Sequence, residues 1–513
     1  MFDPVLINEG HTLKIHSVRS ISDFTKSLYW SSWLFWRSST NRWLLAVLAM
    51  LTGIAVLGGY TAFSKRQAII AQGDELEAFN RKIQKSEFSN DTDLEKIVGR
   101  PLTEEELGKA KTQRMIATLP TSLAYSGGNF NAVLPPSSWM ILGLGFSDLS
   151  PDRYRITAHS RRENLAREDI ASPYQLAYGM WDATTIVLVV MSLVIIALTY
   201  DVVSAERERG LLPLLFVNVV SYRQWVFCNA LIRTLFPVMT VLAISLPLAI
   251  SIALTEGLPD IATPVILWTT VVIGYGLFWM SVAMLVNSGR GSTLQNGVIL
   301  MTVWLCVVCI IPALISRLAI LVQPVLTMSE IITRERELRE TAEQNGSKLL
   351  EDYYLQHPEV SRPSREEDPY GQTRWDAIRL DVDGALQPSI DKQSEQLRMR
   401  LTISEWGMFV SPALAAKIAL DDICGTSLRH HIEFNRRSSE FDEEFKMFFQ
   451  PRMMSREQLT LSDYEAMPQY QQRSLSFTRH NLLLTFSLTS ISAWFGLVFS
   501  VSWYRLRHVF IAN

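Results

Sequence analysis

The sequence predicts a mainly α-helical, polytopic membrane protein with six transmembrane helices and two large insertions on one side of the membrane. Three observations support this fold class. Hydrophobic residues make up 48% of the 513 residues and charged residues only 19%, whereas about a quarter of a typical soluble chain is charged. The mean hydropathy is +0.12. The apolar residues are concentrated in six runs, each close to the roughly 20 residues that a helix needs to cross a bilayer.

The first apolar run, Trp43–Phe63, follows a polar N-terminal segment, residues 1–42. That segment has no cleavage site of the usual small-residue form, so we expect the run to be retained as a membrane anchor. Within the segment, residues 21–38 (ISDFTKSLYWSSWLFWRS) are rich in Trp, Tyr and Phe, which prefer the headgroup level of a membrane. A helix lying along the cytoplasmic surface is the favoured interpretation. A plain cytoplasmic extension of the first span is the alternative.

Five further runs have the length and composition of spans. They are Ala183–Tyr200, Leu235–Leu254, Pro264–Val286, Val298–Ile320 and Leu482–Trp503. Pro237 and Pro247 lie inside the third span of the chain, which is acceptable because neighbouring helices can satisfy the carbonyl groups that a proline frees. Short polar connections join the third span to the fourth and the fourth to the fifth, so each of these pairs forms a hairpin. Spans 2 to 5 occupy residues 183–322, and the sixth span with a short tail occupies residues 482–513.

Lysine and arginine residues near the span ends predict the orientation, because positive charge accumulates in cytoplasmic loops. One side collects Lys14, Arg19, Lys26, Arg37, Arg42, Arg207, Arg209, Arg223, Arg233, Arg290, Arg505 and Arg507. We therefore expect both termini in the cytoplasm. Residues 64–182 and 323–481 then form two extracytoplasmic insertions.

The second insertion has a largely helical pattern. Glu330–Leu355 is dense in Glu, Arg, Lys and Leu, and phenylalanines recur at helical spacing further along, at Phe434, Phe441, Phe445 and Phe448. Such a stripe usually belongs to a packed core rather than to a substrate or cofactor site. We therefore expect a helical domain with an aromatic core.

The connection between the second and third spans, about residues 203–225, carries an unusual pattern. Alternating charges in residues 206–209 (ERER) are followed by Gly210 and then by an apolar segment, LLPLLFVNVV. Exposing such a segment to water is unfavourable, so it should bury its apolar face on the membrane surface or on another protein. The alternative is that the charges only form a solvated cap at the end of the span.

This connection resembles the coupling region of ABC-2 type transporter permeases, in which the second span runs into a Ser-x-Glu-x-Glu-x-Gly motif and a coupling helix. The matching residues are Ser204, Glu206, Glu208 and Gly210. The resemblance implies that the coupling helix rests in a groove of a separate ATPase. Glu206 and Glu208 would then pair with basic residues of the ATPase. The groove would take apolar side chains, namely Leu211, Leu212, Leu214 and Leu215.

The resemblance extends to one branch of this family, which carries a large extracytoplasmic domain between the fifth and sixth transmembrane helices. The segment before the second span matches at Pro173, Leu176, Gly179 and Asp182. The second insertion matches the signature of the branch at Ser411, Pro412, Ala413, Asp421, Gly425, Thr426, Arg429, His430 and Phe434. The similarity begins at about residue 173 and covers the chain from there onward.

The resemblance implies a permease subunit, working in export, in a bacterial inner membrane. Its partners would be ABC ATPase subunits and a second permease, either another copy of this chain or a related subunit. ATP and Mg²⁺ would be bound by the ATPase, and this chain would hold no cofactor. A periplasmic partner of the insertions is a further expectation. The net charge of −3 gives no sign of a nucleic-acid surface, which would need a basic stripe.

The chain carries no motif for chemistry of its own. Neither Gly108-Lys109 nor Gly346-Ser347-Lys348 has the preceding glycine that the phosphate-binding pattern G-x-x-x-x-G-K-[ST] requires. A nucleophile elbow and an HExxH zinc motif are also absent from the sequence. We therefore expect no catalytic residues, and we expect ATP hydrolysis to take place in a partner chain.

Three weaker patterns have two interpretations each. Cys306 and Cys309 have Cys-x-x-Cys spacing inside an apolar helix, where packing is favoured over metal binding because a second pair is missing. The adjacent His430 and His431 point to different faces of a helix, so a shared metal is again disfavoured. Arg317, deep in the fifth apolar run, either snorkels to the outer surface, which is favoured, or lines a translocation path.

The main alternative to transport is a membrane-anchored assembly or binding factor whose extracytoplasmic insertions recruit a partner without moving a solute. The apolar segment in the cytoplasmic connection favours transport, because a simple anchor has no use for it. An intramembrane enzyme ranks last, since the spans contain no paired acid and base, metal or nucleophile motif.

Overall fold

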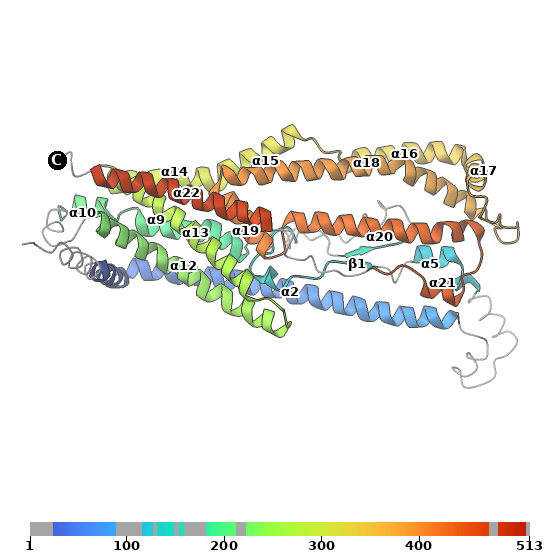
Figure 1. Cartoon of the computed structure of the whole chain (residues 1–513), viewed down its shortest axis with the longest axis horizontal. Coiled ribbons are helices and arrows are strands. Elements are labelled where there is room, and N and C mark those ends of the chain that lie inside the picture. Colours follow the sequence, from blue (N-terminus) through green and yellow to red (C-terminus); the bar gives the residue numbers. More distant parts are fainter. Residues whose placement is uncertain are drawn as a thin grey trace, which may run out of the picture.

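The computed structural model describes residues 24–88, 115–126, 131–147, 153–158, 181–211, 222–470 and 481–508, and these are mainly helical. Figure 1 shows an elongated molecule. Long helices form a bundle in one half, and a second group of helices that includes α16, α18 and α20 extends away from the bundle in the other.

Six helical stretches among the described residues are long and apolar enough to cross a membrane, and each contains one of the six predicted runs. They are built from α2 (Ser39–Glu87), from α8 (Ala183–Thr185), η2 (Ile186–Met191) and α9 (Ser192–Thr199), from α12 (Tyr222–Thr255), from α13 (Ala262–Asn287), from α14 (Thr293–Trp304), η3 (Leu305–Ile310) and α15 (Ile311–Val322), and from α22 (Asn481–His508). The prediction of a mainly helical chain with six candidate spans is confirmed.

The first of these helices continues well beyond the apolar run that revealed it. Helix α2 is a single helix of 49 residues, or about 74 Å at a rise of 1.5 Å per residue. The hydrocarbon core of a bilayer is only about 30 Å thick. The apolar run ends at Phe63, but residues 64–87 contain no proline and only one glycine, so the helix continues into the first insertion.

A separate helix, residues 24–37, precedes α2, and Ser38 divides the two. At the junction the side-chain amide of Asn41 donates a hydrogen bond to the Phe35 carbonyl at 3.2 Å. The ring of Phe35 is buried and stacks on Phe236 of α12, with centroids 4.6 Å apart. The aromatic segment is therefore a helix of its own, and its Phe35 and Trp36 rings both pack on Phe236 of the bundle.

Helix α13 lies at the centre of the bundle, between α12 and α22. Its side chains Trp268, Tyr275 and Trp279 are fully buried. Helix α12 runs without interruption through Pro237 and Pro247, as the sequence allowed.

The second and fifth spans each contain a π-helical stretch, η2 and η3. In a membrane, backbone groups freed by such a stretch need partners from the protein itself. Leu188 in η2 supplies a carbonyl that accepts hydrogen bonds from the Tyr275 hydroxyl at 3.0 Å and the Ser192 hydroxyl at 2.6 Å. Trp304, just before η3, donates its indole N–H to the Ser192 oxygen at 2.8 Å. Side chains from three spans therefore meet around the irregular turns.

The described part of the first insertion is small and closely packed. It contains α5 (Pro120–Ser126), the antiparallel strands β1 (Asn131–Val133) and β2 (Arg153–Arg155), and the buried turn η1 (Ser138–Ile141). Turn η1 packs on α2 and α12. At this contact a Cβ on Gly59 of α2 would lie only 2.2 Å from the Ile141 carbonyl oxygen. The absence of a side chain at Gly59 lets the two backbones approach.

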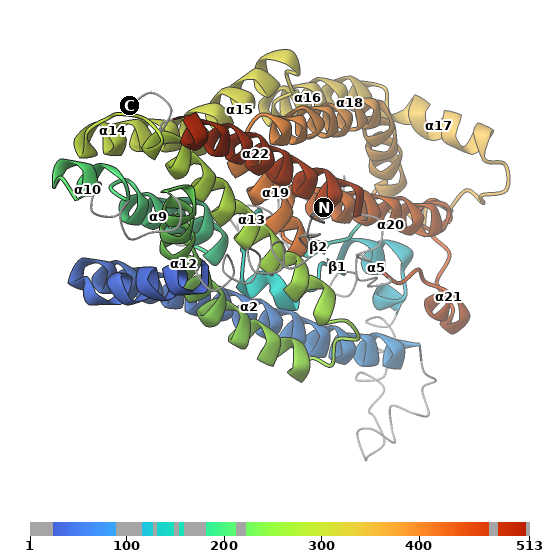
Figure 2. The ribbon, with the colours of Figure 1, turned by 60° about the vertical axis from the view of Figure 1, so that its left-hand side comes forward.

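The second insertion is helical, as predicted. It consists of α16 (Met328–Gln344), α17 (Gly346–Gln356), α18 (Gln372–Trp406), η4 (Gly407–Phe409), α19 (Pro412–Ile423), α20 (Leu428–Ser455) and α21 (Leu461–Glu465). Figure 2 shows α2 and α12 along one side of the molecule and α16 and α18 along the other. Phe434, Phe441 and Phe445 of α20 are buried in one core with Leu123 and Tyr154 of the first insertion. The phenylalanine stripe is a core, and the two insertions share it.

We expect Gly59→Ala to destabilise the protein, because its methyl group would overlap backbone that cannot move aside. Overpacking of this kind costs about 1–3 kcal/mol. Thermal unfolding of the purified protein in detergent measures the effect.

Gly58→Ala is the matched control, because a Cβ at the adjacent Gly58 meets nothing within 4 Å. It should leave the unfolding midpoint unchanged or raise it, since alanine favours a helix over glycine by about 1 kcal/mol. Equal midpoints for the two variants would contradict the contact between α2 and η1.

Candidate functional site

The connection after the second span begins with a short helix, α10 (Ser204–Glu208), which is fixed to the bundle. Val202, Val203 and Ser204 are buried. The two valines pack in one apolar cluster with Val226 of α12 and Leu506 of α22. The helix is too short to be stable alone, so these contacts and the polar ones described next hold it in place.

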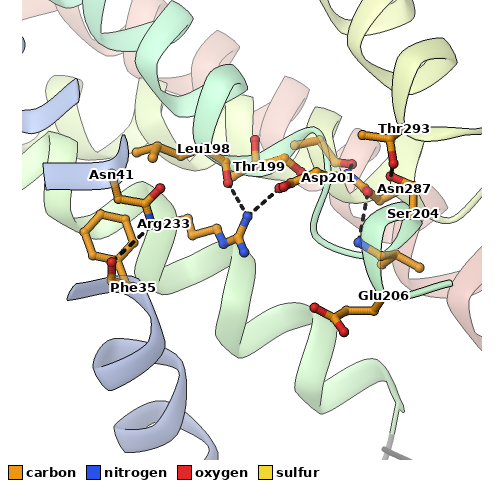
Figure 3. Close-up of polar contacts among 12 residues, drawn as sticks. Phe35, Asn41, Leu198, Thr199, Asp201, Ser204, Glu206, Arg233, Asn287 and Thr293 are labelled. Carbon is orange, nitrogen blue, oxygen red and sulfur yellow. Dashed lines mark hydrogen bonds and ion pairs between the residues drawn. The ribbon is translucent and has the colours of Figure 1, made fainter. Parts of the chain in front are cut away.

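Arg233 of α12 ties the end of the second span to the third. One guanidinium nitrogen donates hydrogen bonds to the Leu198 carbonyl and to the Asp201 carboxylate, both at 2.6 Å (Figure 3). The carbonyl is one of those that a helix leaves without a partner at its C-terminus. The positive charge of Arg233 also interacts favourably with the negative, C-terminal end of the helix dipole.

Asn287 ties the same point to α13. Its side-chain amide donates to the Thr199 and Ala283 carbonyls, both at 2.9 Å, and its oxygen accepts from the Val203 N–H at 3.3 Å (Figure 3). The side chain is almost fully buried. It therefore satisfies two backbone groups at the turn from α9 to α10 and one carbonyl of its own helix.

Residues of α10 also hold the start of the fifth span. The Glu208 carboxylate accepts from the Thr293 N–H at 2.7 Å, the first residue of α14. The Thr293 hydroxyl donates to the Ser204 oxygen at 3.0 Å (Figure 3). Arg207 donates to the Gly289 carbonyl at 2.9 Å in the turn between α13 and α14. The segment 201–208, which includes α10, is thus bonded to α12, to α13 and to the start of α14, and it follows directly from α9.

The four motif residues of the connection have different surroundings. Ser204 and the exposed Glu208 bond Thr293, whereas the half-buried Glu206 lies apart from that network (Figure 3), 3.6 Å from the exposed Arg209. Gly210 has φ of +70°, a conformation that favours glycine. It ends α10 by donating its N–H to the Arg207 carbonyl at 3.0 Å.

Leu211 follows Gly210 and is exposed. The remaining residues of the predicted apolar face, Leu212, Leu214 and Leu215, lie outside the described residues. The same is true of Pro173, Leu176 and Gly179 before the second span. Among the described motif residues, Glu206 pairs within the connection itself and Leu211 is exposed, whereas the exposed Glu208 already has a partner in α14.

The motif of the second insertion forms hydrogen bonds with a loop of the first insertion. The Thr426 hydroxyl donates to the Gly143 carbonyl at 2.9 Å, and the Thr426 carbonyl accepts from the Phe146 N–H at 2.8 Å. Gly425, with φ of +70°, turns the chain so that Thr426 reaches this loop. Asp182, which begins α8, accepts from the Leu144 N–H at 3.0 Å on the other side. This loop of the first insertion is thus held by the second insertion and by the start of the second span.

The other residues of this motif also make structural contacts. Arg429 forms two hydrogen bonds with the Glu405 carboxylate, at 3.1 and 2.5 Å. Phe434 stacks on Tyr154 with centroids 5.3 Å apart. Further contacts come from Ser411, which caps α19 and donates to the Val307 carbonyl at 3.0 Å, Pro412 in the first turn of α19, Asp421, which pairs with Lys417 at 2.7 Å, and His430, which bonds Ser427 at 2.7 Å. We read the motif as a clamp between insertions and bundle.

Arg317 lies five residues before the end of α15, and its side chain is exposed. It faces away from the interior of this chain. This position near a span end is compatible with snorkelling, and a translocation path at Arg317 would need walls from outside this chain.

A second polar cluster joins α5, α18 and α20 and was not foreseen from the sequence. Tyr125 donates its hydroxyl to Asp376 at 2.6 Å, and the Arg379 guanidinium lies 4.5 Å from the Tyr125 ring centroid. Lys446 lies between Asp442 at 3.0 Å and Asp383 at 3.3 Å. Burial raises the pKa of Asp376 and of Asp383. The partners come from segments far apart in the sequence, so no local pattern announces the cluster.

Within the described ranges, no three histidine, cysteine or acidic side chains are grouped so that they could hold a metal ion. Cys306 and Cys309 are unpaired cysteines on η3. The Nε2 atom of His431 lies 3.3 Å from the Ser147 hydroxyl, while His430 faces Ser427, so the two rings have different neighbours.

Comparison with protein families matches residues 328–473 to a domain of unknown function, DUF3526. The match begins at the first residue of α16 and extends past α21, so it lies wholly within the second insertion. No curated protein and no solved structure matches the chain. The match defines the second insertion as a domain and leaves its activity open.

We expect Thr426→Val to weaken the clamp. Valine has the shape of threonine but leaves the Gly143 carbonyl without its donor, and an unsatisfied buried group costs about 1–3 kcal/mol. Chemical unfolding of the detergent-solubilised protein measures the loss. Thr489→Val, at an exposed threonine of α22, is the control and should change stability little. Equal effects of the two substitutions would argue against a clamp.

We also expect a pH effect from Asp422, which is buried beside His430 at 3.7 Å. Burial raises its pKa to about 7, although the Ser427 hydroxyl and Arg429 act in the opposite direction. An unfolded aspartate has a pKa of about 3.9, so the folded state binds the extra proton between these values. Stability from the neutral acid is present at low pH and is lost as the pH rises through about 7.

The measurement compares thermal unfolding of the wild type and Asp422→Asn between pH 5 and 8. Asparagine resembles the neutral acid, so the wild type should lose stability relative to this variant as the pH rises. Parallel pH profiles would show that Asp422 does not titrate in this range.

Proposed function

We propose that this chain is the permease subunit of an ABC-2 type transporter in a bacterial inner membrane, working in export with a separate ATPase. The proposal rests on the sequence motif of residues 204–210 and on the way α10 is mounted. Six candidate spans agree with a permease. ATP and Mg²⁺ belong to the partner chain in this proposal, because the present sequence has no phosphate-binding loop.

The single observation that carries the proposal is the bonding of the segment 201–208, which includes α10, to three further helices. Arg233, Asn287 and Thr293 connect it to α12, α13 and α14, and α9 leads directly into it. A segment that is bonded to several helices transmits a displacement to each of them. An ATPase that binds this connection at Glu206 and Leu211 would therefore move several spans together. A solvated cap would need none of these bonds.

The fifth span supports a second permease subunit. Only 6% of the residues in its most apolar window are buried within the described chain, against 67% in the second span. Its exposed face includes Leu305, Leu314 and Leu318. Lipid covers such a face in an isolated chain, and in a transporter the same face is available for a second copy or a related permease around a shared path.

The test is co-purification of this chain in detergent with the ABC ATPases of its source organism. Wild type should retain an ATPase, and Glu206→Arg should reduce the amount by about tenfold or more, since reversing one charge of a buried pair costs at least 1.4 kcal/mol. Glu206 is the residue to change because Glu208 caps α14, and its loss would disturb the fold itself.

Glu337→Arg is the matched control, a charge reversal at an exposed residue of α16 in the second insertion. It should retain the ATPase as the wild type does. If Glu206→Arg retained as much ATPase as the wild type, the coupling role proposed for α10 would be contradicted. Failure of the wild type to retain any ATPase would favour the alternative of a membrane-anchored assembly factor.

A further inference from the structure

The polar cluster that joins α5, α18 and α20 borders a small cavity. In Figure 1 α20 lies between α18 and α5, and it packs on both of them. The cavity has a volume of about 30 Å³, which is roughly twice the space that one water molecule needs. Its lining includes the apolar side chains of Leu380, Phe449 and Met453 and the charged side chains of Asp376 and Arg379. An apolar wall and a charged end therefore meet in one small space.

Asp376 brings an unused hydrogen-bond acceptor to this cavity. Its Oδ1 atom accepts from the Tyr125 hydroxyl at 2.6 Å, but its Oδ2 atom is buried and has no hydrogen-bond partner among the described residues. Only 7% of the Asp376 side chain is exposed, so bulk water does not replace the missing partner. Buried polar atoms are nearly always hydrogen-bonded. An unpaired carboxylate oxygen at the wall of a cavity therefore points to a ligand group that donates to it.

Arg379, three residues further along α18, brings the complementary group. Its Nη1 atom is also buried and without a hydrogen-bond partner in the described part of the chain. This atom lies 3.9 Å from the Asp376 Oδ1 atom, which is too far for a hydrogen bond. The guanidinium is held over the Tyr125 ring, 4.5 Å from its centroid. An unused donor and an unused acceptor thus lie close together at one cavity.

The charges around the cavity distinguish between classes of ligand. Lys446 is already bonded to Asp442 at 3.0 Å and to Asp383 at 3.3 Å, so the pair of Asp376 and Arg379 is left for a ligand. The cluster holds more carboxylates than basic groups, which makes a cation the competing ligand. A cation at Asp376 would be repelled by Arg379, however, and an anion at Arg379 would be repelled by Asp376. A neutral group that both donates and accepts satisfies the two side chains together.

We propose that this cavity binds a carboxamide group, of the kind that asparagine and glutamine side chains carry. A carboxamide has an NH₂ group that donates and a carbonyl oxygen that accepts. The NH₂ group donates to Asp376 Oδ2, the oxygen accepts from Arg379 Nη1, and the attached carbon chain lies against Leu380, Phe449 and Met453. The site joins α5 of the first insertion to the domain of residues 328–473, and it does not depend on the binding of an ATPase to α10.

Saturation-transfer NMR of the full-length protein in deuterated detergent tests this site with three probes of nearly equal size. Propionamide donates and accepts, propionate only accepts, and propylammonium only donates. Transfer of saturation from the protein to propionamide should be several-fold stronger than transfer to either ion.

Asp376→Asn removes the unused acceptor with little change in shape. The oxygen of the asparagine can still accept from Tyr125, while its NH₂ group meets the NH₂ group of the probe. The propionamide signal should therefore fall several-fold. Asp381→Asn is the matched control, because Asp381 is exposed on the same helix and does not line the cavity. It should keep the signal of the wild type.

Four results would overturn the proposal. Equal signals from the three probes, or equal propionamide signals from the wild type and Asp376→Asn, would show that the two polar atoms do not select the ligand. A stronger signal from propylammonium would make the cavity a cation site. No transfer to any probe would show that water alone satisfies the two atoms. The measurement uses no ATPase, so each of these failures is distinct from a failure of the transport proposal.

Discussion

The arrangement of the whole molecule depends on the contact between the loop 137–147 and the bundle. On one side the Ile141 backbone lies against α2, where Gly59 has no side chain to keep it away. On the other side Thr426 holds the same loop through two hydrogen bonds with Gly143 and Phe146. Because one short loop meets α2, the second span and the second insertion, the parts outside the bundle are built onto a fixed base.

The opposite end of the bundle is organised in the same way but with a different result. Asn287 and Arg233 satisfy carbonyl groups that the end of α9 leaves free, and they do so from α13 and α12. This is the usual requirement that backbone groups near an apolar environment find partners within the protein. The consequence is mechanical, because a displacement of the segment 201–208 is passed to several spans at once. Glu206 and Leu211 bond within this connection and to no other helix in the described part of the chain, so they remain for another protein.

Much of the helical architecture could be predicted from the sequence. Apolar runs of membrane length identified all six candidate spans, and the phenylalanine spacing identified the core of α20. Hydropathy reports where a helix is apolar rather than where it ends, so the extension of α2 to Glu87 was missed. The resemblance to a permease remains a prediction, because the family match defines a domain without an activity.

The bonds of the candidate site could be predicted only in part. Glu206 and Glu208 look equivalent in the sequence, yet only Glu208 is close enough to Thr293 to cap a helix. That distinction depends on the turn between α13 and α14, whose position follows from the packing of the bundle. Asn287 offered a weak signal as a polar residue at the end of an apolar run. The partners of Tyr125 offered none, because they lie more than two hundred residues away.

The transport proposal depends on which end of the bundle faces the cytoplasm. Labelling of single cysteines in intact cells with a membrane-impermeant maleimide measures this directly, using Arg209→Cys beside α10 and Glu337→Cys on α16. We expect Glu337→Cys to be labelled in intact cells and Arg209→Cys to be labelled only after the membrane is opened. Labelling of Arg209→Cys in intact cells, with Glu337→Cys protected, would place α10 out of reach of any cytoplasmic ATPase and contradict the account.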